Sequence, residues 1–152
     1  MSASSLVIIS ASFLLQIAGG RLLASPWWMP DLALAGLMLA MMRERPATRG
    51  ALCLVALLAM LFSAGHSPGT GVAYLVAGGT LVWMSAQWEW AQPSMQLAAL
   101  GVAEGALLLL GVVLHKTRLT WGLLPLVILR IGMTVLSWPL LRRLMGMILR
   151  VP

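Results

Sequence analysis

Apolar residues run almost without interruption along the 152-residue chain, in six segments separated by short turns. The segments cover residues 5–20, 30–42, 50–64, 70–87, 96–114 and 122–141. The turns contain helix-breaking residues, as in SPWWMP, RERPATRG, SAGHSPGTG, EWAQPS and HKTRLTW. Because about 20 apolar residues cross a hydrocarbon layer of about 30 Å, the pattern predicts an all-α, polytopic membrane bundle of about six short transmembrane helices.

Two of these segments, residues 30–42 and 50–64, are shorter than a typical span, and we expect them to thin the bilayer or to extend into its interface. Gly65, Pro68, Gly69 and Gly71 join segments 50–64 and 70–87. A bent or re-entrant pair is therefore an alternative to two full crossings, provided that protein or water surrounds its irregular backbone.

Composition supports a membrane location, since 61% of residues are hydrophobic and only 9% are charged. A soluble domain of this size needs far more polar surface. We therefore expect a single transmembrane domain over residues 1–152. The net charge of +6 is best explained by loop arginines that set topology and contact membrane lipids. Nucleic-acid binding is not expected, because no basic patch is interleaved with exposed aromatic residues.

The distribution of basic residues predicts that both termini lie in the cytoplasm. In that orientation the inner segments contain six arginines and the outer ones three basic residues. The inner set is Arg43, Arg45, Arg49, Arg142, Arg143 and Arg150, and the outer set is Arg21, Lys116 and Arg118. Five tryptophans near the segment ends are expected to form an interfacial belt, namely Trp83, Trp88, Trp90, Trp121 and Trp138.

Two ionisable residues, Glu104 and Arg130, lie inside the fifth and sixth segments. At 1.5 Å per helical residue, Glu104 lies about 16 Å from the turn between these segments and Arg130 about 13 Å from it. Because these depths agree within one helical turn, we predict an ion pair across the hairpin. The pair could be an internal clamp that fixes helix packing, or it could line a polar cavity, relay protons or bind a partner.

Small and polar residues within the segments allow further interpretations. Gly101 and Gly105 form a GxxxG pattern, which packs helices closely within a chain or against a partner; Gly78 and Gly79 offer a similar face. Gln16 is expected to bond a neighbouring helix rather than a ligand.

Asp31 follows Pro30 at the start of the second segment, where a carboxylate suits a helix N-terminus. We expect a cap there first and a binding site second.

No catalytic motif is present: the sequence lacks HExxH, GxSxG and a Walker loop. His66 and His115 fall in predicted loops without a second ligand at a metal-binding spacing. We therefore expect no enzymatic activity, no cofactor and no metal.

The order of several motifs resembles the family of the rod-shape-determining protein MreD, a small membrane protein of bacterial cell elongation. Pro30–Asp31 before an aliphatic run is similar to the family's Pro-Asp-Leu-Leu pattern, and a basic turn from Arg43 to Arg49 precedes Gly50. The other similarities are the turn with Ser63, Gly65, Pro68 and Gly69 or Gly71, the late acid Glu104, and the closing SWPLLRRLMG (residues 137–146).

One family feature is missing. The family commonly has an Asp before the Ser-Gly turn, whereas this chain has Met60 and Leu61 in that neighbourhood. No role of that Asp can be transferred to this chain.

The resemblance implies a non-enzymatic scaffold in the bacterial inner membrane. Its implied partners are an MreC-like single-span protein and, through it, the peptidoglycan glycosyltransferase and transpeptidase of cell elongation. The oligomeric state stays open, and a homo-oligomer is an alternative.

The family fold is similar to the substrate-binding subunits of energy-coupling-factor transporters. The alternative function is therefore a small-molecule-binding subunit with Gln16, Glu104 and Arg130 lining its pocket and an anionic group at Arg130. A cavity near the membrane midplane would favour this subunit, and a closed, well-packed interior around the pair would favour the scaffold.

Overall fold

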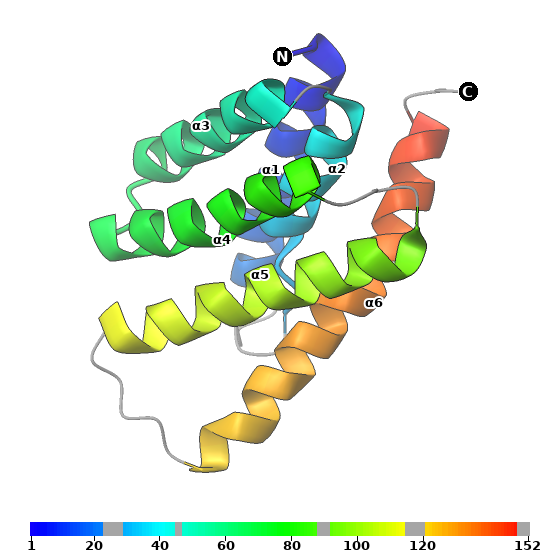
Figure 1. The fold of residues 1–152 in the computed structure, drawn as a ribbon. Coiled ribbons are helices and arrows are strands. Elements are labelled where there is room, and N and C mark those ends of the chain that lie inside the picture. Colours follow the sequence, from blue (N-terminus) through cyan, green and yellow to red (C-terminus); the bar gives the residue numbers. More distant parts are fainter. Residues whose placement is uncertain (23–28, 45–46, 88–91, 115–120, 149–152) are drawn as a thin grey trace.

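The computed structural model describes residues 1–22, 29–44, 47–87, 92–114 and 121–148, which form helices and connecting turns without a strand. The elements are α1 (Ala3–Leu22), α2 (Leu32–Arg43), α3 (Ala47–Ser63), α4 (Pro68–Gln87), α5 (Pro93–Leu114), a short 3₁₀ helix (Trp121–Leu123) and α6 (Leu124–Ile148). These helices confirm the six predicted segments (Figure 1).

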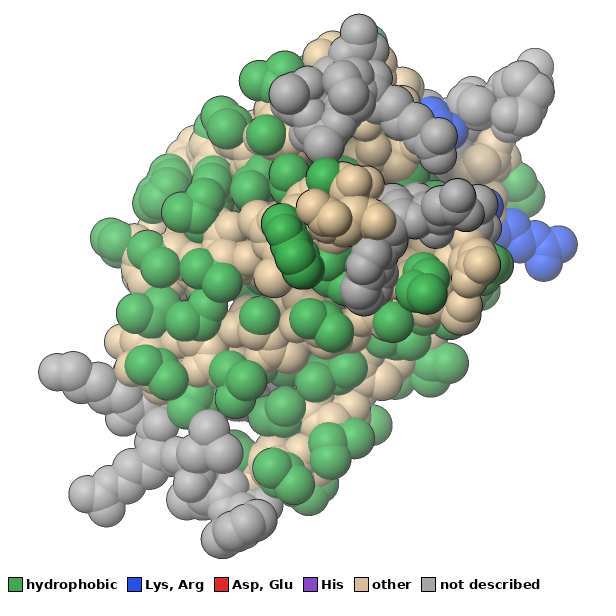
Figure 2. Space-filling model, viewed as in Figure 1, with side chains coloured by type: hydrophobic (Ala, Val, Ile, Leu, Met, Phe, Trp, Pro, Cys, Tyr) green, Lys and Arg blue, Asp and Glu red, His purple; other side chains and the backbone are tan. Residues whose placement is uncertain are grey.

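Three of the helices are long and apolar enough to cross a membrane: α1, α5 and residues Leu124–Leu144 of α6. Large apolar side chains also cover the outside of the bundle. Figure 2 shows them spread over the whole visible face, with basic side chains gathered near the C-terminal end of α6. Because such a surface is unfavourable in water, these features indicate a helical membrane protein.

The centre of the bundle is α2, which packs against all five of the other α-helices. Nine consecutive residues of α2, from Ala33 to Met41, are buried. A helix of this length extends only about 18 Å, less than the thickness of a hydrocarbon core. The continuous burial shows that surrounding helices cover α2 on every side. Its short length means that its ends need not reach the two surfaces of a membrane.

The residues of the turn between α3 and α4 explain how one helix ends and the next begins. Gly65 has a φ of 76°, and the amides of Gly65 and His66 donate to the carbonyls of Phe62 and Leu61, which is a Schellman ending of α3. Ser67 then caps α4, its Oγ accepting from the amide of Thr70 at 3.2 Å. Both helices are regular up to this turn, so irregular backbone is confined to residues 64–67.

The last helix is longer than the segment predicted at 122–141, and one prediction about it is wrong. The helix continues through Pro139 to Ile148, because a single proline removes only one backbone hydrogen bond. Trp138 is not at an interface but is buried at 3% exposure, and its Nε1 donates to Gln96 Oε1 at 3.3 Å. Trp83, in contrast, is 61% exposed.

Several residues used in the sequence-based predictions of orientation, of the interfacial belt and of metal binding lie outside the described residues. They are Arg45, Trp88, Trp90, His115, Lys116, Arg118 and Arg150.

Candidate functional site

Arg130 forms the predicted ion pair with Glu104. Its Nε donates to Glu104 Oε1 at 2.9 Å, which joins α6 to α5. The depth argument from the hairpin therefore identified the correct partner. Glu104 is fully buried, whereas the Arg130 side chain keeps 18% of its exposure.

A second carboxylate, that of Asp31, also faces Arg130. Arg130 Nη2 lies 3.5 Å from Asp31 Oδ2, and Tyr74 donates its hydroxyl to the same oxygen at 2.5 Å. The other oxygen, Oδ1, accepts from the amide of Leu34 at 2.8 Å. The predicted helix cap at Asp31 is thus confirmed, and the same carboxylate also belongs to the buried ion network.

These contacts connect four helices at one place. Asp31 lies at the start of α2, Tyr74 on α4, Glu104 on α5 and Arg130 on α6. A further bond strengthens the link to α6, because the amide of Asp31 donates to Thr134 Oγ1 at 2.9 Å. We name Asp31, Tyr74, Glu104, Arg130 and Thr134 the Arg130 network.

The formal charge of the Arg130 network is −1, with two carboxylates facing one guanidinium. Asp31 and Glu104 are both completely buried, and a buried charge is tolerated only when it is paired and hydrogen-bonded. Arg130 is the one cation that contacts these two acids among the described residues. Glu104 Oε2 is buried without a hydrogen-bond partner in the described part of the chain.

Gln16 contacts the start of α2, as predicted for a residue that bonds a neighbouring helix. Its Oε1 accepts from the amide of Leu32 at 2.7 Å. Because that amide can only donate, the contact fixes the orientation of the side-chain amide. The NH₂ group of Gln16 is consequently not used in this contact.

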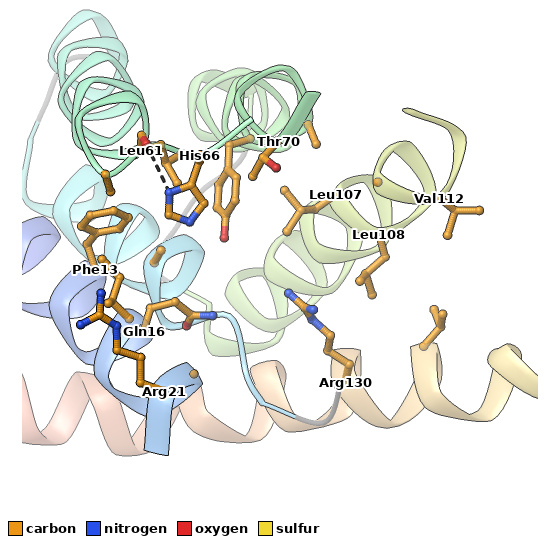
Figure 3. Close-up of a pocket in the computed structure, with 18 of the residues that line it drawn as sticks. Phe13, Gln16, Arg21, Leu61, His66, Thr70, Leu107, Leu108, Val112 and Arg130 are labelled. Carbon is orange, nitrogen blue, oxygen red and sulfur yellow. Dashed lines mark hydrogen bonds between the residues drawn. The ribbon is translucent and has the colours of Figure 1, made fainter. Parts of the chain in front are cut away.

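A cavity of about 760 Å³ adjoins the Arg130 network. Its polar lining residues are Gln16, Arg21, His66, Thr70, Tyr74 and Arg130. Figure 3 shows α1 and α2 on one side of the cavity, the turn between α3 and α4 above it, and Leu107, Leu108 and Val112 of α5 opposite. Arg130 projects into this space from α6.

Most of the glycines proposed as a packing or partner face contact other helices of the same chain. A Cβ at Gly101 or Gly105 would fall 3.7–4.0 Å from side chains of α6. Gly78 is packed against Leu37 and Leu54, whereas Gly79 has open space around it. The GxxxG pattern therefore serves internal packing of α5 against α6, and Gly79 alone of the four remains open.

At the opposite end of α2, Glu44 forms a second buried acidic site. It follows the last residue of α2, is 5% exposed, and accepts hydrogen bonds from the amide of Ser2 and from Ser5 Oγ. The hydrogen bond from the backbone of Ser2 is the main cause that lowers the pKa of Glu44 to about 2. Glu44 thus ties the C-terminal end of α2 to the beginning of α1.

Two members of the Arg130 network were missed from the sequence. Tyr74 is the chain's single tyrosine and lies in the middle of an apolar segment, where a phenolic hydroxyl needs a partner. That signal pointed to a buried acceptor but not to Asp31. Thr134 carried no comparable signal, because threonine can bond the carbonyls of its own helix.

His66 belongs to the rim of the cavity and not to a metal cluster. Its Nδ1 lies 3.2 Å from the carbonyl oxygen of Leu61. No group of three metal-ligating side chains is present among the described residues.

No family model, curated protein or solved structure matches the chain. The likeness to the MreD family therefore stays a prediction from the sequence.

Proposed function

We propose that the chain is a non-enzymatic scaffold of the bacterial inner membrane and acts in cell elongation as an MreD-like protein. It places about six short helices in the membrane, with both termini in the cytoplasm. An MreC-like single-span protein binds its helices and connects it to the peptidoglycan glycosyltransferase and transpeptidase.

This proposal rests on one observation: two of the motifs that resemble the MreD family contribute residues to the Arg130 network. Pro30–Asp31 and Glu104 are far apart in the sequence, yet both acids contact Arg130. The residues that suggested the family are thus also those that hold α2, α5 and α6 together.

The physical role of the Arg130 network in such a scaffold is to fix helix register. Helices in lipid associate through close packing and polar contacts, and a buried ion pair can specify one arrangement. With α2 joined to α4, α5 and α6 by these contacts, the lipid-facing surfaces of the outer helices keep a constant shape. Gly79 of α4, which has open space around it, is available for close approach by a partner helix.

Co-purification from native membranes in mild detergent tests this function. The wild-type chain should retain a single-span periplasmic protein and the cell-wall synthases, whereas Arg130→Ala and Glu104→Ala should lose them. Arg143→Ala is the matched control, because Arg143 is an exposed arginine of the same helix. Recovery of the wild type alone, or with an ATP-driven transport module, would contradict the scaffold.

The cavity favours a second candidate, a small-molecule-binding subunit of an energy-coupling-factor type transporter. Gln16 and Arg130 line that cavity, as expected for such a protein, whereas Glu104, which was expected with them, does not. However, two carboxylates already face its guanidinium, so Arg130 by itself offers little net positive charge to an anion. The interior is packed where Arg130 meets Asp31 and Glu104, and it is open where Arg130 lines the cavity. Because the guanidinium is already paired, we prefer the scaffold to the transporter subunit.

A further inference from the structure

The cavity combines an apolar wall with a polar side rich in hydrogen-bond donors. Its volume of about 760 Å³ lies within the range of about 300–1,000 Å³ that is typical of small-molecule sites. Phe13, Ile17, Leu107, Leu108 and Leu126 supply apolar surface. A ligand must therefore contain a substantial hydrocarbon part.

The polar groups that remain available in the cavity are mainly donors. Gln16 has used its oxygen on Leu32, which leaves its NH₂ group. Tyr74 has used its one hydroxyl hydrogen on Asp31, so it keeps only an acceptor oxygen, and the carboxylates of Asp31 and Glu104 do not line the cavity. Arginine carries donors only. The matching ligand group is one with several acceptor oxygens.

Electrostatics limits the charge of that group to about one negative unit. Arg130 is offset by Asp31 and Glu104, but Arg21 has no carboxylate partner among the described residues. Arg21 can therefore pair directly with one negative charge of a ligand, whereas the second charge of a dianion would meet no unpaired cation among the described lining residues. The uncompensated cation is Arg21, which lies on the same helix as Gln16.

We infer that the cavity binds one amphipathic monoanion, with its acidic headgroup at Arg21 and Gln16 and its hydrocarbon chain against α5 and α6. An anionic bilayer phospholipid and a free fatty acid share this chemistry. Occupancy is compatible with both functions above, since neither requires an empty cavity.

Photolabelling of the full chain in phosphatidylcholine nanodiscs tests the site. The probe is a diazirine-bearing palmitate, and the corresponding diazirine alcohol is its uncharged match. The acid should label the cavity wall at Leu108 or Leu126 at least about fivefold more than the alcohol. Both probes should label Leu136 equally, because Leu136 is 68% exposed and faces away from the bundle.

Two variants locate the headgroup and the chain. Arg21→Gln should reduce cavity labelling by the acid at least about fivefold, whereas the control Arg143→Gln should not change it. Gly111→Leu should abolish cavity labelling, because Gly111 lines the cavity and a Cβ there meets no atom within 4 Å. Unchanged labelling of Leu136 shows that the probe concentration in the bilayer is the same for each variant, and an unchanged denaturation midpoint shows that each variant is folded.

Competition distinguishes the two sources. Phosphatidylglycerol in the nanodisc should displace the probe if the ligand is a bilayer lipid, and dissolved octanoate should displace it if the ligand is a free fatty acid. Competition by neither would overturn the inference, as would equal labelling by acid and alcohol in the cavity. These results are independent of co-purification, so the site and the scaffold can fail separately.

Discussion

The shortest and the longest α-helices among the described residues, α2 and α6, have opposite surroundings. The 12-residue α2 is buried continuously from Ala33 to Met41, whereas the 25-residue α6 is buried, among its described side chains, only at Thr134, Trp138 and Leu141. Both are mainly apolar, because lipid and protein interior accept the same side chains. Apolar composition alone therefore does not show which helix forms the core of a membrane bundle; polar contacts and close approaches do.

The largest expected effect comes from cutting the link between these two helices. Arg130→Ala leaves Asp31 and Glu104 buried without their cation, and should cost about 3–5 kcal/mol of unfolding free energy unless an acid takes up a proton. Denaturant titration in mixed micelles, followed by circular dichroism, measures the loss. A loss below about 1 kcal/mol would show that the two acids do not depend on Arg130.

Leucine truncation compares the two helices directly. Leu37 of α2 has no exposed surface, and Leu136 of α6 is 68% exposed. Leu37→Ala should cost about 2 kcal/mol, the low end of the range for buried leucine, because in lipid mainly packing is lost. Leu136→Ala should change the unfolding free energy by less than about 0.5 kcal/mol. Equal losses in the same titration would mean that α6 is also covered by protein.

Glycine substitution tests how closely α2 is approached. A Cβ at Gly36 would overlap the Cβ of Ser12 on α1, whereas a Cβ at Gly132 on α6 meets nothing within 4 Å. Gly36→Ala should therefore cost about 1–3 kcal/mol through overpacking. Gly132→Ala should be neutral or stabilise the helix by up to about 1 kcal/mol. If both variants unfold like the wild type, α1 and α2 are further apart than the structure has them.

The smallest effect is expected at the other end of α2, where neutral donors hold Glu44. Its folded-state pKa of about 2 is below the ordinary value of about 4.3. Glu44 therefore adds stability above pH 5, and this contribution is lost as pH falls from about 5 towards 2. Comparing wild type with Glu44→Gln between pH 6 and pH 3 measures it, and the variant should show the weaker pH dependence. Parallel curves would exclude this role for Glu44.

The sequence predicted the six α-helices and, within the Arg130 network, the ion pair between Glu104 and Arg130. Helical depth alone was sufficient to pair Glu104 with Arg130, because both lie on one hairpin. Asp31 was recognised as a cap but not as an ion partner of Arg130, since no local pattern relates residues 99 positions apart. The contact depends on how α2 is placed against α6, which is a tertiary property.

The burial of particular side chains was less predictable than the helices that carry them. Trp138 near a segment end suggested an interfacial belt, yet the turn of α6 that it occupies faces Gln96 of α5. The alternative function had named Gln16 and Arg130 as pocket residues, but the shape of the cavity could not be predicted from the sequence, because its walls come from six helices. Its position depends on side chains that do not fill the space beside Arg130.

The most direct test of the central claim is a double-mutant cycle on Arg130 and Glu104. Unfolding free energies would be measured for Glu104→Leu, for Arg130→Met and for the double variant. We predict that the double variant recovers about 1–3 kcal/mol relative to the sum of the single losses, because neither charge is left alone. Strictly additive losses would contradict the account, since they would show that the two residues stabilise the bundle independently.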